Sequence, residues 1–107
     1  MLTSTTNDIF GHRIVRHIGV VRGITVRSRN LVSDAIGGVQ SMLGGRVGAY
    51  VKLAEMSRQE AFEHLIEQAR AAGGNAILAI RYESNEIMPG VTEVLAYGTA
   101  VVVEVGQ

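Results

Sequence analysis

The chain contains no cysteine and no tryptophan, and it has 1 proline among its 107 residues. Without thiols it can form neither disulfides nor thiolate metal sites, and it has no cysteine nucleophile. A cysteine-free chain is typical of a reducing compartment, so we expect a cytoplasmic location. Aromatic residues make up 5% of the chain, which argues against the aromatic platforms that stack on single-stranded nucleic acid.

An excess of charge of either sign is also lacking. The 10 Lys and Arg residues balance 10 Asp and Glu residues, so the formal net charge is +0. A chain without excess positive charge has no overall field that attracts nucleic acid or an anionic membrane, and we expect neither partner. No apolar run approaches the roughly 20 residues of a membrane span, and the polar residues 3–8 do not resemble a signal peptide.

What the chain does contain is aliphatic, because hydrophobic residues make up 47% of it. A length of 107 residues suits one modest core, so we expect a single domain over residues 1–107. Residues 13–27 are rich in β-branched side chains and predict one long first strand. Gly19 and Gly23 within that strand predict a bend or a bulge.

Two segments with helical periodicity follow the first strand. Ser33 and Asp34 offer a cap for a short helix over residues 34–43, in which a glycine pair lowers the helix propensity. The stronger pattern extends from about residue 49 to 72, with apolar side chains along one side. We expect this long helix to end at Gly73 and Gly74, because glycine adopts the left-handed cap conformation without strain.

Residues 76–87 and 92–105 flank Pro89-Gly90 and predict an antiparallel hairpin. If Ile87 lies opposite Thr92, both faces of this hairpin are apolar, and the face with the bulkier side chains is expected to receive the long helix. That bulkier face carries Leu78, Ile80, Tyr82, Leu95, Tyr97, Val101 and Val103.

The second apolar face needs a cover, because an antiparallel sheet under one helical layer is normally polar on its other side. One candidate cover is the short helix of residues 34–43, and the other is a second copy of the chain. We favour the second copy, which predicts a symmetric homo-oligomer.

His12, His17 and His64 are the nitrogen ligands that a metal could use. Strand alternation places His12 and His17 on opposite faces, and His64 lies on the polar side of the long helix, so no metal residues are assigned within one chain. Copies of one histidine can still meet at a symmetry axis. No nucleophile with a base and no pair of carboxylates can be assembled, so no catalytic residue is assigned and we do not expect an enzyme.

Arginine supplies every basic residue except Lys52. Its planar guanidinium binds carboxylates and phosphates at two points, and we expect most arginines to pair with the interleaved acidic residues. The best candidate for an anion site is the run Arg27-Ser28-Arg29-Asn30 at the end of the first strand.

Short motifs over nearly the whole chain resemble those of the YbjQ family of small bacterial proteins. These motifs are Thr5-Thr6-Asn7, Gly19-Val20-Val21-Arg22-Gly23, Arg27-Ser28-Arg29-Asn30, Gly44-Gly45-Arg46, Tyr50, Gly73-Gly74-Asn75-Ala76-Ile77 and Tyr97-Gly98-Thr99-Ala100-Val101-Val102. The resemblance implies an α+β fold, with a β-α-β-β subunit similar to the dodecin type. That subunit has a long bent first strand, one short and one long helix, and a C-terminal antiparallel hairpin.

The resemblance also implies assembly as a ring or barrel-like homo-oligomer, specifically a homopentamer. The family is often labelled heavy-metal-binding. This chain fits that label poorly, because it has no thiolate and its histidines are scattered.

We therefore expect a non-enzymatic oligomeric protein whose intersubunit clefts hold a small ligand, with an anion as the favoured class. The candidate ligand-binding residues are polar groups at strand and helix ends, where subunits of a ring would meet: Arg27, Arg29, Asn30, Tyr50 and Asn75. The alternative is a protein that binds a divalent or heavy metal through histidines at symmetry-related positions. The sequence does not indicate a particular cofactor.

Overall fold

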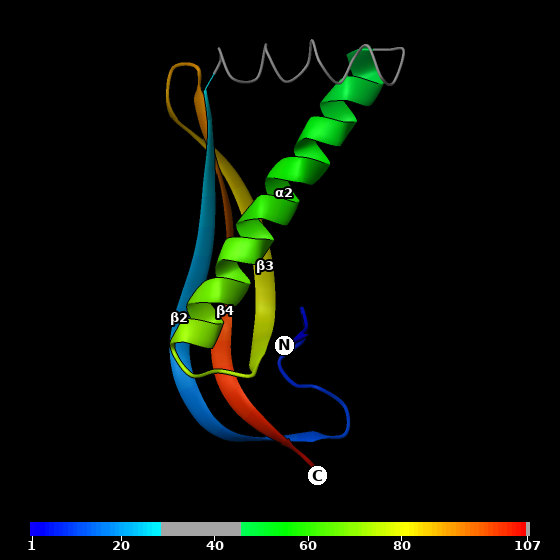
Figure 1. Cartoon of the computed structure of the whole chain (residues 1–107), viewed down its shortest axis with the longest axis vertical. Helices are drawn as coiled ribbons and strands as arrows, with labels where there is room; N and C mark the ends of the chain where they lie inside the picture. Colours follow the sequence, from blue (N-terminus) through cyan, green and yellow to red (C-terminus); the bar gives the residue numbers. More distant parts are fainter. Residues whose placement is uncertain (29–45, 107) are drawn as a thin grey trace.

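A computed structural model describes residues 1–28 and 46–106. Its elements are β1 (Leu2–Thr3), β2 (His12–Ser28), α2 (Arg46–Ala71), β3 (Ala76–Met88) and β4 (Val91–Val105). The strands form one mixed sheet in the order β1-β3-β4-β2, and α2 lies across one face of it (Figure 1). The predicted α+β class, long first strand, long helix and C-terminal hairpin are confirmed, whereas the short helix predicted over residues 34–43 lies outside the described residues.

β2 is long and bent, as its glycines predicted. The strand has 17 residues, and its pairing with β4 shifts register between Ile14 and Arg16 and again between His17 and Gly19. Gly19 has a φ of 141°, a backbone conformation that residues with a side chain rarely adopt. The irregularities lie in the first part of β2, which stays paired with β4 and curves with it at the lower end of the view, while the rest of β2 runs straighter (Figure 1).

α2 ends at the predicted glycine pair. Gly73 has a φ of 93°, and its N–H donates to the carbonyl of Arg70 at 3.0 Å. The N–H of Gly74 donates to the carbonyl of Ala69 at 2.9 Å, so two carbonyls of the last helical turn are satisfied. This cap turns the chain directly into β3.

The helix packs on the face with the smaller side chains, so the expectation that the bulkier face receives it is wrong. Fully buried Ala61, Leu65 and Ala69 pack in one cluster with residues of three strands. Those strand residues are Val21, Ile77, Ile80, Val94, Ala96 and Ala100. A Cβ atom on Gly23 would lie 2.1 Å from the carbonyl oxygen of Ala61, so the backbones of α2 and β2 are in direct contact there. The helix packs on the small side chains because they let the two layers approach this closely.

A bulge in β3 is the reason that simple alternation assigned the faces incorrectly. The register of β3 against β4 shifts between Leu78 and Arg81, and Ala79 has a φ of 55°. As a result Ile80 joins the helix-facing cluster, while Leu78 belongs to the opposite side. Near the turn, Glu86 rather than Ile87 lies opposite Thr92. An inserted residue inverts every later assignment along a strand.

The chain itself covers part of the second face. Ile9 and Ile14 pack against a second buried cluster formed by Ala76, Leu78, Val101 and Val103. The upper part of the same face has no such cover among residues 1–28 and 46–106. There Val20 is 79% exposed, and Ile24 and Val26 on the same strand are also exposed.

The N-terminal segment protects the outer edge of β3. β1 runs parallel to β3, and the following residues continue its hydrogen bonding, with Ser4 donating to the Ile77 carbonyl at 3.0 Å. The N–H of Ala79 donates to the Thr6 carbonyl at 2.9 Å, which satisfies the backbone at the bulge. This ordered polar segment closes an edge that would otherwise be open to another strand.

Candidate functional site

α2 diverges from the sheet toward its N-terminus (Figure 1). A cleft lies between the helix and the sheet there. Its volume is about 270 Å³. The helix supplies one wall, the β3–β4 hairpin supplies the other, and Arg27 extends into it from the end of β2. The described lining residues are Arg27, Tyr50, Leu53, Ala54, Ser57, Arg58, Ser84, Thr92 and Val94.

Arg27 is held in place by the helix. Its Nη2 lies 2.9 Å from Oε2 of Glu60, and its Nε donates to Oγ of Ser57 at 3.1 Å. The hydrogen bond from Arg27, together with a second one from Thr25, lowers the pKa of the Glu60 carboxyl below its usual value. Glu60 is therefore ionised at neutral pH, and it compensates the charge of Arg27 within the protein.

Arg58 differs from Arg27 because it has no carboxylate partner in the part of the chain that the structure describes. Its guanidinium carbon lies 5.4 Å from the centre of the Tyr82 ring, a cation–π distance. Burial raises the pKa of the Tyr82 phenol, and the positive charge of Arg58 opposes part of that rise. Arg58 thus brings to the cleft, on a partly restrained side chain, a positive charge that no carboxylate of residues 1–28 and 46–106 compensates.

The structure places two of the predicted ligand-binding residues together. Arg27 and Tyr50 both line the cleft, whereas Arg29 and Asn30 lie outside the described residues. Asn75 lies elsewhere, at the start of β3 beyond the far end of α2.

Asn75 makes structural contacts in its position. Its Nδ2 donates to the carbonyl of Val103 at 2.9 Å, and its Oδ1 accepts from the N–H of the same residue at 2.8 Å. The side chain thereby continues the hydrogen bonding of the hairpin where β3 has not yet begun.

Sequence reasoning missed Arg58, Ser57 and Ser84 as cleft residues. A helical spacing of three and four residues places one group of residues on the same side of α2, and this spacing is visible in the sequence. The group is Tyr50, Leu53, Ala54, Ser57 and Arg58. Ser84 carried no comparable signal, because the bulge at residue 79 decides which side of the sheet it faces.

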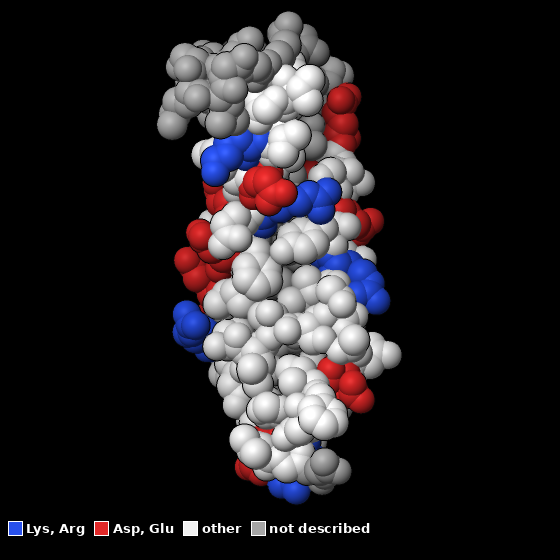
Figure 2. Space-filling model, turned by 90° about the vertical axis from the view of Figure 1, so that its right-hand side faces the viewer, with Lys and Arg blue, Asp and Glu red and all other residues white. Residues whose placement is uncertain are grey.

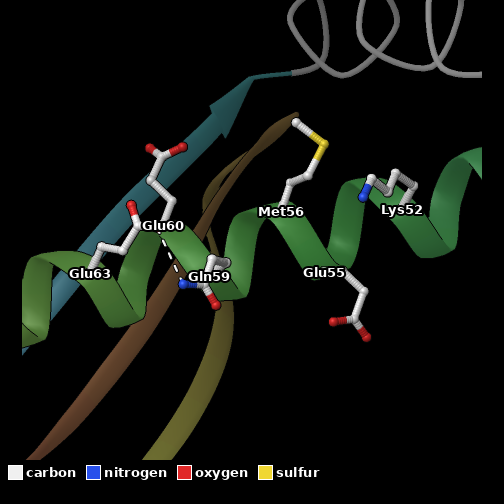
Figure 3. Close-up of a pocket in the computed structure, with 6 residues that line it drawn as sticks. All are labelled: Lys52, Glu55, Met56, Gln59, Glu60 and Glu63. Carbon is white, nitrogen blue, oxygen red and sulfur yellow. Dashed lines mark hydrogen bonds between the residues drawn. The ribbon is translucent and has the colours of Figure 1, made fainter.

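A second hollow follows the outer side of α2, with a volume of about 440 Å³ (Figure 3). Its described lining residues all belong to the helix: Lys52, Glu55, Met56, Gln59, Glu60 and Glu63. Figure 3 shows the carboxylates of Glu55 and Glu60 pointing in different directions. The hydrogen bond drawn there joins Nε2 of Gln59 to Oε1 of Glu63 at 3.2 Å. These acidic groups do not converge on one point and form no binding site.

Residues 1–28 and 46–106 contain no group of three or more His, Asp or Glu side chains that could hold a metal ion. Nδ1 of His64 lies 2.9 Å from the carbonyl oxygen of Ile24, and Nδ1 of His12 lies 3.1 Å from that of Phe10. The described residues of one chain therefore do not fit a metal centre.

Charged side chains of both signs are mixed over the side of the molecule seen in Figure 2. They are concentrated in its upper half, and the lower half is mostly uncharged. Neither sign forms a continuous patch on this side. The described part of the chain also has no helix with the length and apolarity needed to cross a membrane.

Comparison with known proteins reveals relatives over almost the whole chain. Residues 1–104 match the YbjQ family model, whose description is "Putative heavy-metal-binding". A UPF0145 protein of Burkholderia thailandensis is 51% identical over 100 residues, which cover 94% of this chain and 90% of that protein. A UPF0145 protein of Burkholderia mallei matches to the same extent.

A solved structure shows the same fold. It is a protein of unknown function from the DUF74 family of Pediococcus pentosaceus, and it superposes with a TM-score of 0.65 at 19% sequence identity. The superposition covers 97% of this chain and 98% of that one. The match of the family model and the close Burkholderia relatives confirm the resemblance seen in the motifs: this chain belongs to the YbjQ family.

Proposed function

We propose that this protein is a non-enzymatic binding protein that holds a small anion in the cleft between α2 and the sheet. The observation that carries the proposal is the Arg58 guanidinium, which lines the cleft without a carboxylate partner in the described chain. Arginine provides a planar fork of N–H donors that suits an oxyanion. The hydroxyls of Ser84 and Thr92 line the same cleft and can add further hydrogen bonds.

The walls of the cleft strengthen such an interaction. Leu53 and Val94 are buried and apolar, and they face the cleft from the helix and from the sheet. Partial exclusion of water lowers the local dielectric constant, so a charge pair is worth more there than on an open surface. Arg27 shapes the site, since Glu60 and Ser57 already hold it.

Amide chemical shifts in ¹⁵N-labelled protein, titrated with acetate, benzoate, sulfate and phosphate, test this proposal. We expect saturable changes at Ser57, Ser84, Thr92 and Val94 for at least one anion. Arg58→Gln should weaken that binding about tenfold, because a charge-assisted hydrogen bond is lost.

Arg13→Gln is the matched control. Arg13 pairs with Glu104 on an exposed surface near the start of β2, and it lines no part of the cleft. Binding that is equal in wild type and Arg58→Gln, or shift changes confined to the region of Asn75, would remove the site.

Self-assembly is the second part of the proposal. The homopentamer implied by the family resemblance is supported by exposed apolar side chains on the uncovered upper part of the sheet, chiefly Val20 and its neighbours Ile24 and Val26. Light scattering at micromolar concentration should give about five chain masses, and Val20→Lys should reduce the assembly. A wild-type monomer under these conditions would contradict it. In this proposal the open side of the cleft between α2 and the sheet faces a neighbouring subunit, and the protein is cytoplasmic.

The family description supports a second candidate ligand, a divalent or heavy metal held by histidines from several copies. His17 suits this role best of the three, because its side chain is exposed and makes no hydrogen bond within the described residues. Elemental analysis of protein purified without an affinity tag should then find metal that His17→Ala removes. Less than one ion per assembly would reject this candidate.

A further inference from the structure

The charge balance of the cleft between α2 and the sheet restricts the anion that it can hold. Of the described residues that line the cleft, two are arginines, and the charge of Arg27 is already compensated by Glu60 at 2.9 Å. Within this described lining, Arg58 supplies the one positive charge that is left for a ligand. A second negative charge on the ligand would enter a partly apolar site without a partner, which costs free energy. The cleft therefore favours a monoanion over a dianion.

The walls of the cleft restrict the shape of the ligand. One wall is a helix surface of short side chains, with Leu53, Ala54 and Ser57, and the other is the pleated surface around Val94. The cleft lies between these two facing walls, and a space between two facing walls accepts a flat group more readily than a globular one. Tyr50 from the helix also lines the cleft and offers an aromatic surface to such a group.

The volume of the cleft restricts the size of the ligand. At about 270 Å³ it lies just below the roughly 300 to 1,000 Å³ of pockets that hold drug-sized molecules. At about 30 Å³ for each water molecule in the liquid, this volume corresponds to roughly nine waters. A single six-membered ring with one short acidic substituent has this size.

We infer that the cleft binds a compact aromatic monocarboxylate, with the carboxylate on Arg58 and the ring between Leu53 and Val94. The inference rests on the proposed function, and it adds the chemical class of the ligand. A carboxylate accepts two parallel hydrogen bonds from a guanidinium, and Arg58 presents its guanidinium beside the ring of Tyr82. The apolar ring replaces water against the buried side chains of both walls.

Calorimetric titration with four ligands of similar size tests each part of the inference. Benzoate carries one charge on a planar ring, benzamide is its neutral counterpart, cyclohexanecarboxylate has the same charge without planarity, and phenyl phosphate is a dianion at pH 8. We expect benzoate to bind tightest. Benzamide and phenyl phosphate should bind about tenfold more weakly, and cyclohexanecarboxylate several-fold more weakly.

Two variants locate the binding. Arg58→Gln should weaken benzoate binding about tenfold and leave benzamide binding unchanged, because only the charge-assisted contact is lost. Ala54→Phe should abolish the binding of both ligands by filling the cleft, and it leaves both arginines in place. Ala54 is exposed on the helix, so this change does not disturb the buried core.

The outcomes separate this inference from the proposed function. If phenyl phosphate binds more tightly than benzoate in an Arg58-dependent manner, the monocarboxylate assignment is overturned and the anion site remains. If cyclohexanecarboxylate equals benzoate, the aromatic part is wrong. If neither these ligands nor the inorganic anions bind, the proposed function and this inference fail together.

Discussion

The two halves of α2 meet the sheet in opposite ways. In the C-terminal half, Ala61, Leu65 and Ala69 are fully buried, and the helix backbone touches the strand at Gly23. In the N-terminal half the helix stands away from the sheet, and apolar Val47 and Val51 are exposed (Figure 1). One continuous helix is therefore a core element at one end and the wall of a cleft at the other.

Side-chain size on the sheet explains the difference between these halves. Beneath the packed half lie Gly23, Ala96 and Gly98, where little or nothing projects from the sheet. Beneath the diverging half lie Arg27 and Thr92, whose side chains occupy the space between the layers. Where side chains are missing the layers close, and where polar side chains project the layers separate.

The strongest test of this comparison is Gly23→Ala. The added Cβ would lie 2.1 Å from the Ala61 carbonyl oxygen and 2.3 Å from the Leu65 nitrogen, so the helix must move away. We expect a loss of about 3 kcal/mol or more in the free energy of unfolding, measured with urea. Neither backbone can move away at a low cost in free energy.

Gly98→Ala provides a graded comparison for that variant. Its Cβ would meet the Leu78 carbonyl oxygen at 2.8 Å and side-chain atoms of Ile77 and Ile80, which can adjust. We expect a smaller loss of about 1–3 kcal/mol. A loss at Gly23 that is no larger than the loss at Gly98 would contradict direct backbone contact as the basis of the packed half.

Truncation of one leucine in each half compares the packing of the two halves directly. Leu65 is 0% exposed in the packed half, and Leu53 is 9% exposed beside the cleft. Leu65→Ala should cost about 4 kcal/mol, and Leu53→Ala about 2 kcal/mol, because the open side of Leu53 limits the cavity that forms. Thermal and urea unfolding of both variants test whether Leu65→Ala loses more stability than Leu53→Ala. Equal losses would show that the two halves pack equally well.

The ion pair between Arg27 and Glu60 should make a small, pH-dependent contribution. The pKa of Glu60 is lowered in the folded protein, so its contribution is present above the unfolded-state pKa of about 4.5 and is lost as the pH falls through the folded value. In a plot of the free energy of unfolding against pH, the acid limb is the loss of stability at low pH. Glu60→Gln should reduce that loss by less than about 1 kcal/mol, since the pair is partly exposed.

A double-mutant cycle with Arg27→Gln is the control for this pair. Once Arg27 is neutral, the further change Glu60→Gln should have a smaller effect on the acid limb than in wild type, because only one of the two hydrogen bonds, that from Thr25, still favours the ionised carboxylate. An unchanged acid limb in Glu60→Gln alone would mean that the pair does not contribute.

The smallest expected effect is at the outer edge of β2, where the packed half of α2 protects the strand. The N–H of Arg22 donates to Oε1 of Gln68 at 2.5 Å, and His64 contacts the Ile24 carbonyl. Gln68→Ala should cost about 0.5 kcal/mol and speed amide hydrogen exchange at Arg22. The backbone amide of Val21, the residue before Arg22, whose side chain faces the core, serves as the internal reference for exchange. Unchanged exchange at Arg22 would show that Gln68 does not protect this edge.

Much of the fold was predictable because its signals are local. The glycine pair at residues 73–74 marked the end of the helix, Pro89-Gly90 marked the hairpin turn, and β-branched residues marked the long first strand. The faces of the hairpin were not predictable, because the bulge at Ala79 depends on hydrogen bonds to residues far away in the sequence. The inserted residue moved Ile80 to the helix-bearing side, and the choice of the bulkier face for the helix was wrong because the layers close on small side chains.

The candidate site was predicted in part for the same reason. Arg27 and Tyr50 were expected as ligand-binding residues and do line the cleft, since strand and helix ends often meet in space. Asn75 was grouped with them but lies at the other end of the helix, where it hydrogen-bonds Val103. Arg58 was not singled out, because an arginine on a helix gives no sign of whether a carboxylate will lie beside it.

By itself the sequence determined the three long strands, the long helix, the glycine pair that ends it and the family, since each depends on neighbouring residues or on motifs in order along the chain, whereas the two-residue β1 was not predicted. The tertiary structure alone decided which face of the sheet α2 covers and that, of the two arginines in the described lining of the cleft, Arg27 has a carboxylate partner and Arg58 has none among the described residues. Both depend on distances between segments far apart in the chain, such as the contact of Gly23 with Ala61 and that of Arg27 with Glu60. Side-chain volume and charge act between these distant residues. A pattern of neighbouring residues does not reveal which distant residues will meet.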